Sequence, residues 1–228
     1  EVLNVARSAE PLARARRVLS RLRMLAPAVP AAAASLSPVR VAFLVRDNLR
    51  RRRAIEQAYI EAIGHARHRV DLACPYFYPG RVFMRTLRDA ARRGVQVRLL
   101  LQGKPDYRFA MLAAEVLYDD LLASGARVFE YTPAFLHAKV AVVDGDWATV
   151  GSSNIDPLSL LLNLEANVIV RDEAFAADLA GRLEAACQAS REVLGPPVPA
   201  GWWAVARRGF VAWTAHWFLR LAGMSGRY

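Results

Sequence analysis

Six residues within the stretch LHAKVAVVDGDWATVGSSNID, residues 136–156, have types and spacing that suit phosphoryl chemistry. The pattern is H-x-K-x4-D-x6-G-S-x-N, and its members are His137, Lys139, Asp144, Gly151, Ser152 and Asn154. An imidazole can attack phosphorus or protonate a leaving oxygen near neutral pH. An ammonium and an amide donor can stabilise charge on the non-bridging oxygens. The pattern predicts phosphodiester chemistry performed by side chains, with no metal and no cofactor.

The lysine of this pattern stands out against the composition of the chain. Of 31 basic side chains, only Lys104 and Lys139 are lysines, and all the others are arginines. A compact ammonium acts as a point charge, and a planar guanidinium does not reproduce its geometry. We therefore expect the site to require an ammonium at position 139.

The spacing also predicts how these groups meet. Alternate side chains of a strand share a face, so His137 and Lys139 are expected to project together from a strand over 137–143. Asp-Gly at 144–145 predicts a hairpin turn, which gives Asp144 a structural role. The second strand of the hairpin then returns Ser152 and Asn154 to the histidine end.

The rest of the chain predicts the elements that position this hairpin. Strands are expected at 39–45, 69–79 (the last part a Pro-flanked aromatic loop), 95–103, 126–131 and 165–172, and helices at 50–68, 81–94, 108–125 and 173–194. Gly94 is expected to end its helix. This alternation indicates an α/β fold, a layered α/β/α sandwich around a mixed β-sheet.

Three parts of the chain differ in character. Residues 1–38 read as a basic helix and an Ala/Pro-rich connector, and 39–195 as the catalytic part. Residues 196–228 hold four of the five tryptophans among arginines, which predicts a C-terminal amphipathic Trp-rich segment at a membrane interface or, alternatively, a helix docked on the domain. The net charge of +10 indicates an anionic partner, either a membrane surface or nucleic acid.

The motif resembles the HKD signature of the phospholipase D superfamily. Flanking stretches such as PYFYPGRVFMRTLRDAARRGVQVRLLLQGKPD and DPLSLLLNLEANVIV are similar to the second half of bacterial cardiolipin synthases, most closely of the B type. The resemblance covers roughly residues 40 to 220. It implies a domain used in pairs, in which two halves with one HKD motif each form a single active site and one histidine becomes a phosphohistidine.

The resemblance also implies roles for single residues. His137 and Lys139 belong to the catalytic centre, with His137 as general acid and base if the chain is a second half, and Ser152 and Asn154 bond the phosphate. Glu165 matches a glutamate that orients a histidine in this family; an ordinary strand-edge glutamate is the alternative. Asp144 and Gly151 are structural. Tyr76 and Phe77 either line the substrate pocket or pack in the core.

The function implied by the resemblance is phosphatidyl transfer to phosphatidylglycerol, which makes cardiolipin at an anionic membrane surface. Only one HKD motif is present, so the second half is expected from a homodimer mate or from a longer chain. We expect a peripheral protein on the cytoplasmic side of a bacterial inner membrane, with no nucleic acid partner. The alternatives are a single-motif homodimeric nuclease and a membrane-binding module without turnover.

Overall fold

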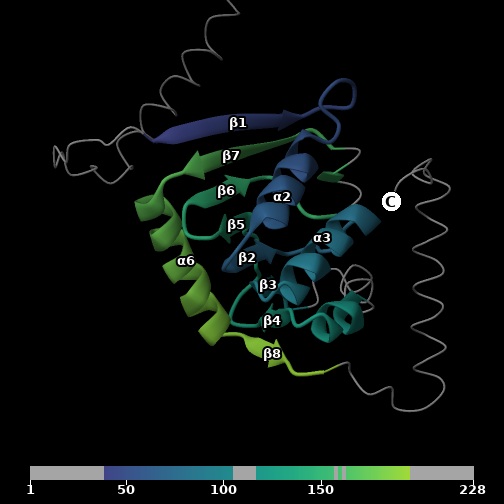
Figure 1. Ribbon diagram of the computed structural model, residues 1–228, viewed down its shortest axis with the longest axis vertical. Helices are drawn as coiled ribbons and strands as arrows, with labels where there is room; N and C mark the ends of the chain where they lie inside the picture. The colour runs from purple at the N-terminus through teal and green to yellow at the C-terminus, as the bar shows by residue number, and fades with distance from the viewer. Residues whose placement is uncertain (1–38, 105–116, 157–158, 161–162, 196–228) are drawn as a thin grey trace, which may run out of the picture. The chain divides into compact units, whose positions relative to one another are not determined.

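Eight strands form one mixed sheet in the order β1-β7-β6-β5-β2-β3-β4-β8 (Figure 1). The computed structural model describes residues 39–104, 117–156, 159–160 and 163–195. The strands are β1 (Arg40–Arg46), β2 (Arg69–Cys74), β3 (Gln96–Gln102), β4 (Arg127–Tyr131), β5 (Val140–Val143), β6 (Trp147–Gly151), β7 (Glu165–Arg171) and β8 (Arg191–Val193). Strands β2, β3 and β4 are parallel to one another, and all the other neighbouring pairs are antiparallel.

Helices cover both faces of this sheet, so the predicted layered α/β/α sandwich is confirmed. Helices α2 (Ala54–His65) and α3 (Arg81–Arg92) lie on one face, and α6 (Glu173–Gln188) lies on the other (Figure 1). A further helical segment spans 117–123. The predicted basic helix and connector of 1–38, the start of the helix predicted at 108–125 and the tail 196–228 lie outside the described residues.

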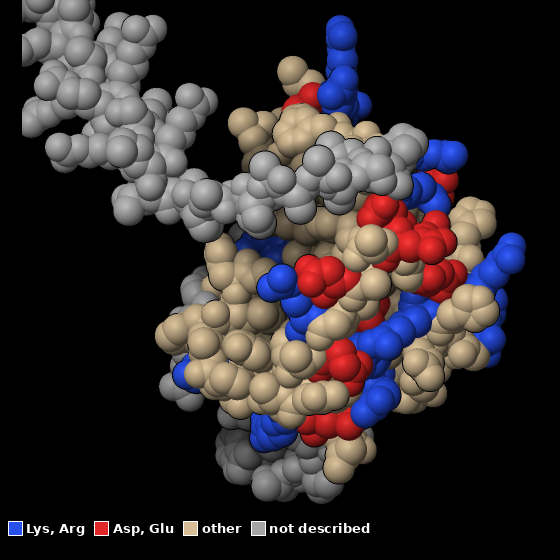
Figure 2. Space-filling model, turned by 90° about the vertical axis from the view of Figure 1, so that its left-hand side faces the viewer, with Lys and Arg blue, Asp and Glu red and all other residues tan. Residues whose placement is uncertain are grey.

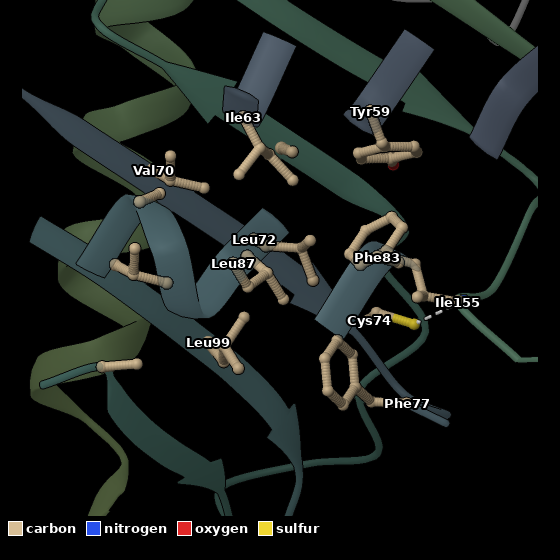
Figure 3. Packing of buried hydrophobic residues seen from close by; sticks show 14 of the residues in the cluster. Tyr59, Ile63, Val70, Leu72, Cys74, Phe77, Phe83, Leu87, Leu99 and Ile155 are labelled. Carbon is tan, nitrogen blue, oxygen red and sulfur yellow. Dashed lines mark hydrogen bonds between the residues drawn. The ribbon is translucent and has the colours of Figure 1, made fainter. Parts of the chain in front are cut away.

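The larger core lies between the sheet and the α2/α3 layer. Its members include Ile63 of α2, Leu87 of α3 and Leu72 of β2, which point toward one another in Figure 3. Helix α3 forms because its buried residues, Phe83, Met84, Leu87 and Ala90, recur on one side of a 3.6-residue period.

Gly94 ends this helix, as predicted, with φ +92°. Its N–H bonds Ala91 O at 2.9 Å and the N–H of Val95 bonds Ala90 O at 3.1 Å, which is a Schellman motif.

Helix α6 is held on the opposite face partly by charge. Arg98, whose side chain is 8% exposed, lies 2.6 Å from both Asp71 and Glu184, and Arg69 lies 2.6 Å from Asp71. The carboxylate of Asp172 accepts the N–H of Phe175 at 2.7 Å and begins the helix. The helix predicted over 173–194 is wrong at its end, because 191–193 form β8, an edge strand paired with β4.

The segments that carry the motif meet at one end of the strands. The register pairs Arg46 with Glu165, Gly151 with Asn167 and Val140 with both Val150 and Ala73. The carboxyl ends of β1, β2 and β6 therefore meet the amino ends of β5 and β7. We call this end of the sheet the site end; it lies on the right in Figure 1, where the arrowhead of β1 points.

Candidate active site

His137 and Lys139 lie in an extended segment immediately before β5, which starts at Val140. The prediction that they lie on the strand itself is therefore wrong, although Gly151 N still donates to Lys139 O at 3.1 Å. Their side chains nevertheless come together as predicted. Lys139 Nζ donates to His137 O at 2.9 Å and lies 3.4 Å from each ring nitrogen of His137. The imidazole of His137 and the ammonium of Lys139 are therefore in contact.

The two side chains differ in their access to solvent. His137 is exposed, whereas Lys139 is buried. Burial lowers the pKa of the Lys139 amine, and the negative charges of Glu165 and Asp156 partly oppose this effect. The ammonium is therefore fixed in place beneath an imidazole that remains open to a substrate.

The turn after β6 carries the polar part of the motif. Ser152 N donates to Ala166 O at 3.0 Å, which fixes the start of the turn against β7. Asn154 Oδ1 lies 3.9 Å from Cys74 Sγ, and Ile155 N donates to the same sulfur at 3.3 Å, as the dashed line in Figure 3 marks. Cys74 was not among the predicted site residues; its thiol, at the end of β2, holds this turn beside Lys139.

Glu165 makes a different contact from the one that the resemblance implies. The hydroxyl of Ser152 donates to its carboxylate, and Asn163 Nδ2 donates to it at 3.4 Å. Among the described residues no hydrogen bond joins Glu165 to His137. Glu165 contacts Ser152 in this structure, and its role in orienting a histidine stays a prediction. The β6/β7 register pairs Gly151 with Asn167, so Ser152, the next residue, lies beside Ala166 and within reach of the neighbouring Glu165.

Asp144 lies at the far end of the hairpin, where φ is 52° at Asp144 and 81° at Gly145. Its carboxylate accepts the backbone N–H groups of Arg67, His68 and Arg69 at 2.7, 2.8 and 2.9 Å. Burial alone would raise the pKa of this carboxyl, but the three N–H donors outweigh burial and lower it. These bonds join the hairpin to the segment entering β2, which agrees with a structural role.

Gly151 is required by close packing. A Cβ at this position would lie 2.1 Å from Asn167 Oδ1 and 2.5 Å from Ala166 O, both on β7. Only a residue without a side chain lets β6 approach β7 here and leaves Ser152 within reach of Glu165.

The two aromatic residues predicted either to line the pocket or to pack in the core, Tyr76 and Phe77, differ in their burial. Phe77 is 1% exposed and packs in the larger core, so it does not line an open pocket. It also bridges Ile155 across the loop, which couples the aromatic loop to the motif turn. Tyr76 is half-buried, and its backbone oxygen accepts the Cys74 thiol at 2.8 Å; a pocket role for Tyr76 stays a prediction.

Arg46 is a second residue near the site that was not predicted from the sequence. It is 1% exposed and pairs in register with Glu165. Its Nη1 donates to Asn163 O, and its Nε lies 3.4 Å from Arg52 O. A charged residue at the end of the apolar strand VAFLV was the available signal, and its buried contacts reveal a residue that supports the Glu165 segment.

Within the described part of the chain, no group of three or more His, Cys, Asp or Glu side chains is arranged to hold a metal ion. No helix among the described residues is long and apolar enough to cross a membrane.

Known proteins resemble this chain in sequence. A family model described as "Cardiolipin synthase, PLD-like domain" matches residues 59–186. Cardiolipin synthase B of Escherichia coli (strain K12) is 47% identical over 162 residues, which are 69% of this chain and 39% of that protein. Cardiolipin synthase A of Pseudomonas aeruginosa (strain LESB58) is 43% identical over 127 residues, 56% of this chain and 26% of that protein. The chain therefore spans well under half the length of these curated relatives.

Solved structures resemble the fold at low sequence identity. The phospholipase D family member Nuc from Salmonella typhimurium has a TM-score of 0.58 at 19% identity, covering 68% of this chain and 99% of that one. Phosphatidylserine synthase of Haemophilus influenzae Rd KW20 has a TM-score of 0.58 at 12% identity, covering 82% and 46%. These structures share the fold. The family model, which matches more than half of this chain, shows that the chain belongs to the cardiolipin synthase family of phospholipase D-like proteins.

Proposed function

We propose that this chain is one half of a phosphatidyltransferase that makes cardiolipin from phosphatidylglycerol. The observation that carries the proposal is the exposed imidazole of His137 in contact with the buried ammonium of Lys139. This pair can exchange a proton or a phosphoryl group and stabilise the phosphate charge at the same point. The relatives named cardiolipin synthase support a phospholipid substrate.

The proposed reaction has two steps and uses one histidine from each half. In the first step, the nucleophilic imidazole attacks the phosphorus of the donor lipid. The P–O bond to the alcohol breaks, and the second histidine protonates the leaving oxygen. In the second step, a hydroxyl of phosphatidylglycerol loses its proton to that histidine and attacks the phosphohistidine, and the P–N bond breaks. If the chain is a second half, as its resemblance implies, His137 takes the acid and base role.

Four other residues have supporting roles in this proposal. Lys139 and the amide of Asn154 donate to the non-bridging oxygens. Ser152 is assigned to the same oxygens, and its single hydroxyl proton, which is donated to Glu165, turns to the phosphate when the substrate binds. Charge stabilisation by such fixed donors contributes about a hundredfold to a thousandfold each.

The site needs a second half, because one chain supplies one HKD motif. We propose that it comes either from a homodimer mate or from the remainder of a longer chain. The protein would act peripherally on an anionic bilayer at the cytoplasmic side of a bacterial inner membrane, with phosphatidylglycerol as its partner and without a metal or cofactor.

The test begins with the native mass of the 25.2 kDa chain in mild detergent. A dimer is assayed directly on phosphatidylglycerol vesicles, with cardiolipin and glycerol measured by mass spectrometry; a single chain is first supplied with a second half. His137→Ala should abolish transfer and leave thermal unfolding unchanged. The matched control is His65→Ala, because His65 is an exposed histidine at the end of α2. Full transfer by the His137 variant refutes the assignment.

A phosphodiesterase acting on nucleic acid is the second candidate, and the charge of +10 favours it. Cleavage of DNA that depends on His137, with steeply salt-dependent binding and no reaction on vesicles, would select this candidate. Vesicle binding without any change in phospholipid would instead indicate a module without turnover.

A further inference from the structure

Three large apolar side chains are strongly exposed at the site end of the sheet. Leu49 is 87% exposed, Leu164 is 76% exposed and Phe135 is 65% exposed. Leu164 immediately precedes Glu165, and Phe135 lies two residues before His137. Isolated exposed apolar residues are common, but three on separate loops around one site indicate an interaction surface.

These side chains surround the site from two sides. The loop of Leu49 follows β1 and projects beyond the sheet at the upper right of Figure 1. Arg46 connects this loop to the segment of Leu164, since it bonds both Arg52 O and Asn163 O. Phe135 lies on the β4–β5 connection, with Lys104 Nζ 5.8 Å from its ring centroid. We call these three loops, with residues 47–53, 163–164 and 133–135, the site rim.

The site rim also carries available positive charge. Arg50, Arg51 and Arg52 are exposed, and within the described part of the chain none of them forms an ion pair. The nearby carboxylate of Asp47 is occupied, because it accepts the N–H groups of Leu49, Arg50 and Arg51 at 2.8–2.9 Å. These three bonds fix the backbone of the loop that carries the exposed Leu49.

The side of the molecule that bears α6 is different. Figure 2 shows that acidic and basic side chains are mixed there. Two of its exposed arginines are paired, Arg182 with Asp178 at 2.9 Å and Arg171 with Asp146 at 3.3 Å. Arg50, Arg51 and Arg52 of the site rim differ from these two arginines, because no ion pair joins them to a carboxylate among the described residues.

We propose that the site rim is the surface by which the protein docks on an anionic phospholipid bilayer. Leu49, Leu164 and Phe135 enter the boundary between headgroups and acyl chains, and Arg50, Arg51 and Arg52 bind lipid phosphates. In the strand order, β5 lies between the β1/β7 side, which carries Leu49 and Leu164, and β4. His137, just before β5, then faces the headgroup layer from which the substrate comes. This inference rests on the proposed function only in its choice of a lipid partner.

The first test follows the position of Leu49 directly. Cys74 and Cys187 are both buried, so Leu49→Cys can be labelled selectively with an environment-sensitive dye. On phosphatidylglycerol vesicles its emission should shift to the blue and be quenched by spin-labelled lipid, and Leu164→Cys should respond likewise. Leu194→Cys is the matched control, because Leu194 is 90% exposed after β8 at the opposite end of the sheet. Equal responses at 49 and 194, or none at 49, overturn the proposal.

The second test removes the charge. Each arginine near an anionic leaflet changes partitioning by about fivefold, so the triple change Arg50→Gln, Arg51→Gln, Arg52→Gln should weaken vesicle binding by about a hundredfold at low salt. Arg182→Gln should leave binding unchanged. Binding that persists in the triple variant, or a dye response at 49 to duplex DNA but not to vesicles, overturns the proposal.

These results are independent of catalysis. His137→Ala should retain the dye response while losing transfer, and a protein that shows the dye response without any turnover would refute the proposed function alone.

Discussion

Replacing Gly151 by alanine should disrupt the junction of β6 and β7 on which the site is built. The new Cβ would lie 2.1 Å from Asn167 Oδ1, 2.3 Å from Asn167 Cγ and 2.5 Å from Ala166 O. Asn167 is 1% exposed and cannot move into solvent without breaking its 3.2 Å bond to Thr149 Oγ1. Because one of the obstacles is a backbone carbonyl, a change of rotamer alone cannot relieve the overlap.

The magnitude follows from two costs. Overpacking of a dense interior destabilises by about 1–3 kcal/mol. Displacing the buried Asn167 amide from its partner adds about 1–3 kcal/mol. We therefore expect Gly151→Ala to lower the free energy of unfolding by about 3 kcal/mol, taking the middle of both ranges and some relaxation. For a chain of this size this loss lowers Tm by about 6–12 °C.

The assay is denaturant unfolding of the variant beside a matched glycine replacement. Gly181→Ala lies within α6 with nothing within 4 Å of the added methyl group, and it should stabilise by about 0.5–1 kcal/mol. Asn167→Ala removes two of the three close contacts at position 151, so the double variant should be less destabilised than the sum of the single changes. A Gly151→Ala protein within about 0.5 kcal/mol of the parent would refute the packing argument.

Three further predictions concern single groups. Asp144→Asn should cost about 1–3 kcal/mol at neutral pH; since the folded pKa of Asp144 is lowered, the difference should vanish as the pH falls below 3.8 and through the folded value, which pH-dependent unfolding measures. Lys139→Met should reduce kcat on phosphatidylglycerol vesicles by about a hundredfold to a thousandfold, and Lys139→Arg should recover only part of it; an arginine variant with full kcat contradicts the need for an ammonium. Burial raises the pKa of Cys74 and Cys187 to about 12, so neither thiol should react with a disulfide reagent near pH 8 until the protein unfolds; rapid reaction of the native protein contradicts this.

Local patterns predicted most of the elements, because each of these elements follows from neighbours in the chain. The apolar period of 81–92 marked α3, Gly94 marked its end, and Asp-Gly at 144–145 marked the turn of the hairpin. The prediction of elements is wrong where pairing with a segment distant in the sequence determines the structure. The segment 191–193 became a strand because its backbone pairs with β4, about 60 residues earlier, which no local helical pattern can show.

The chemical groups of the site could be named from the motif, because its spacing specifies an imidazole, an ammonium, a hydroxyl and an amide on a hairpin. The contacts that support these groups depend on the fold. The pairing of β6 with β7 brings Ser152, and not His137, into hydrogen-bond contact with Glu165, and Phe77 is buried in the core. The fold also brings Arg46 into contact with Asn163, which is 117 residues away in the sequence. The physical reason is that hydrogen-bond partners and burial are fixed by which strands become neighbours, and that information is distributed over the whole sheet.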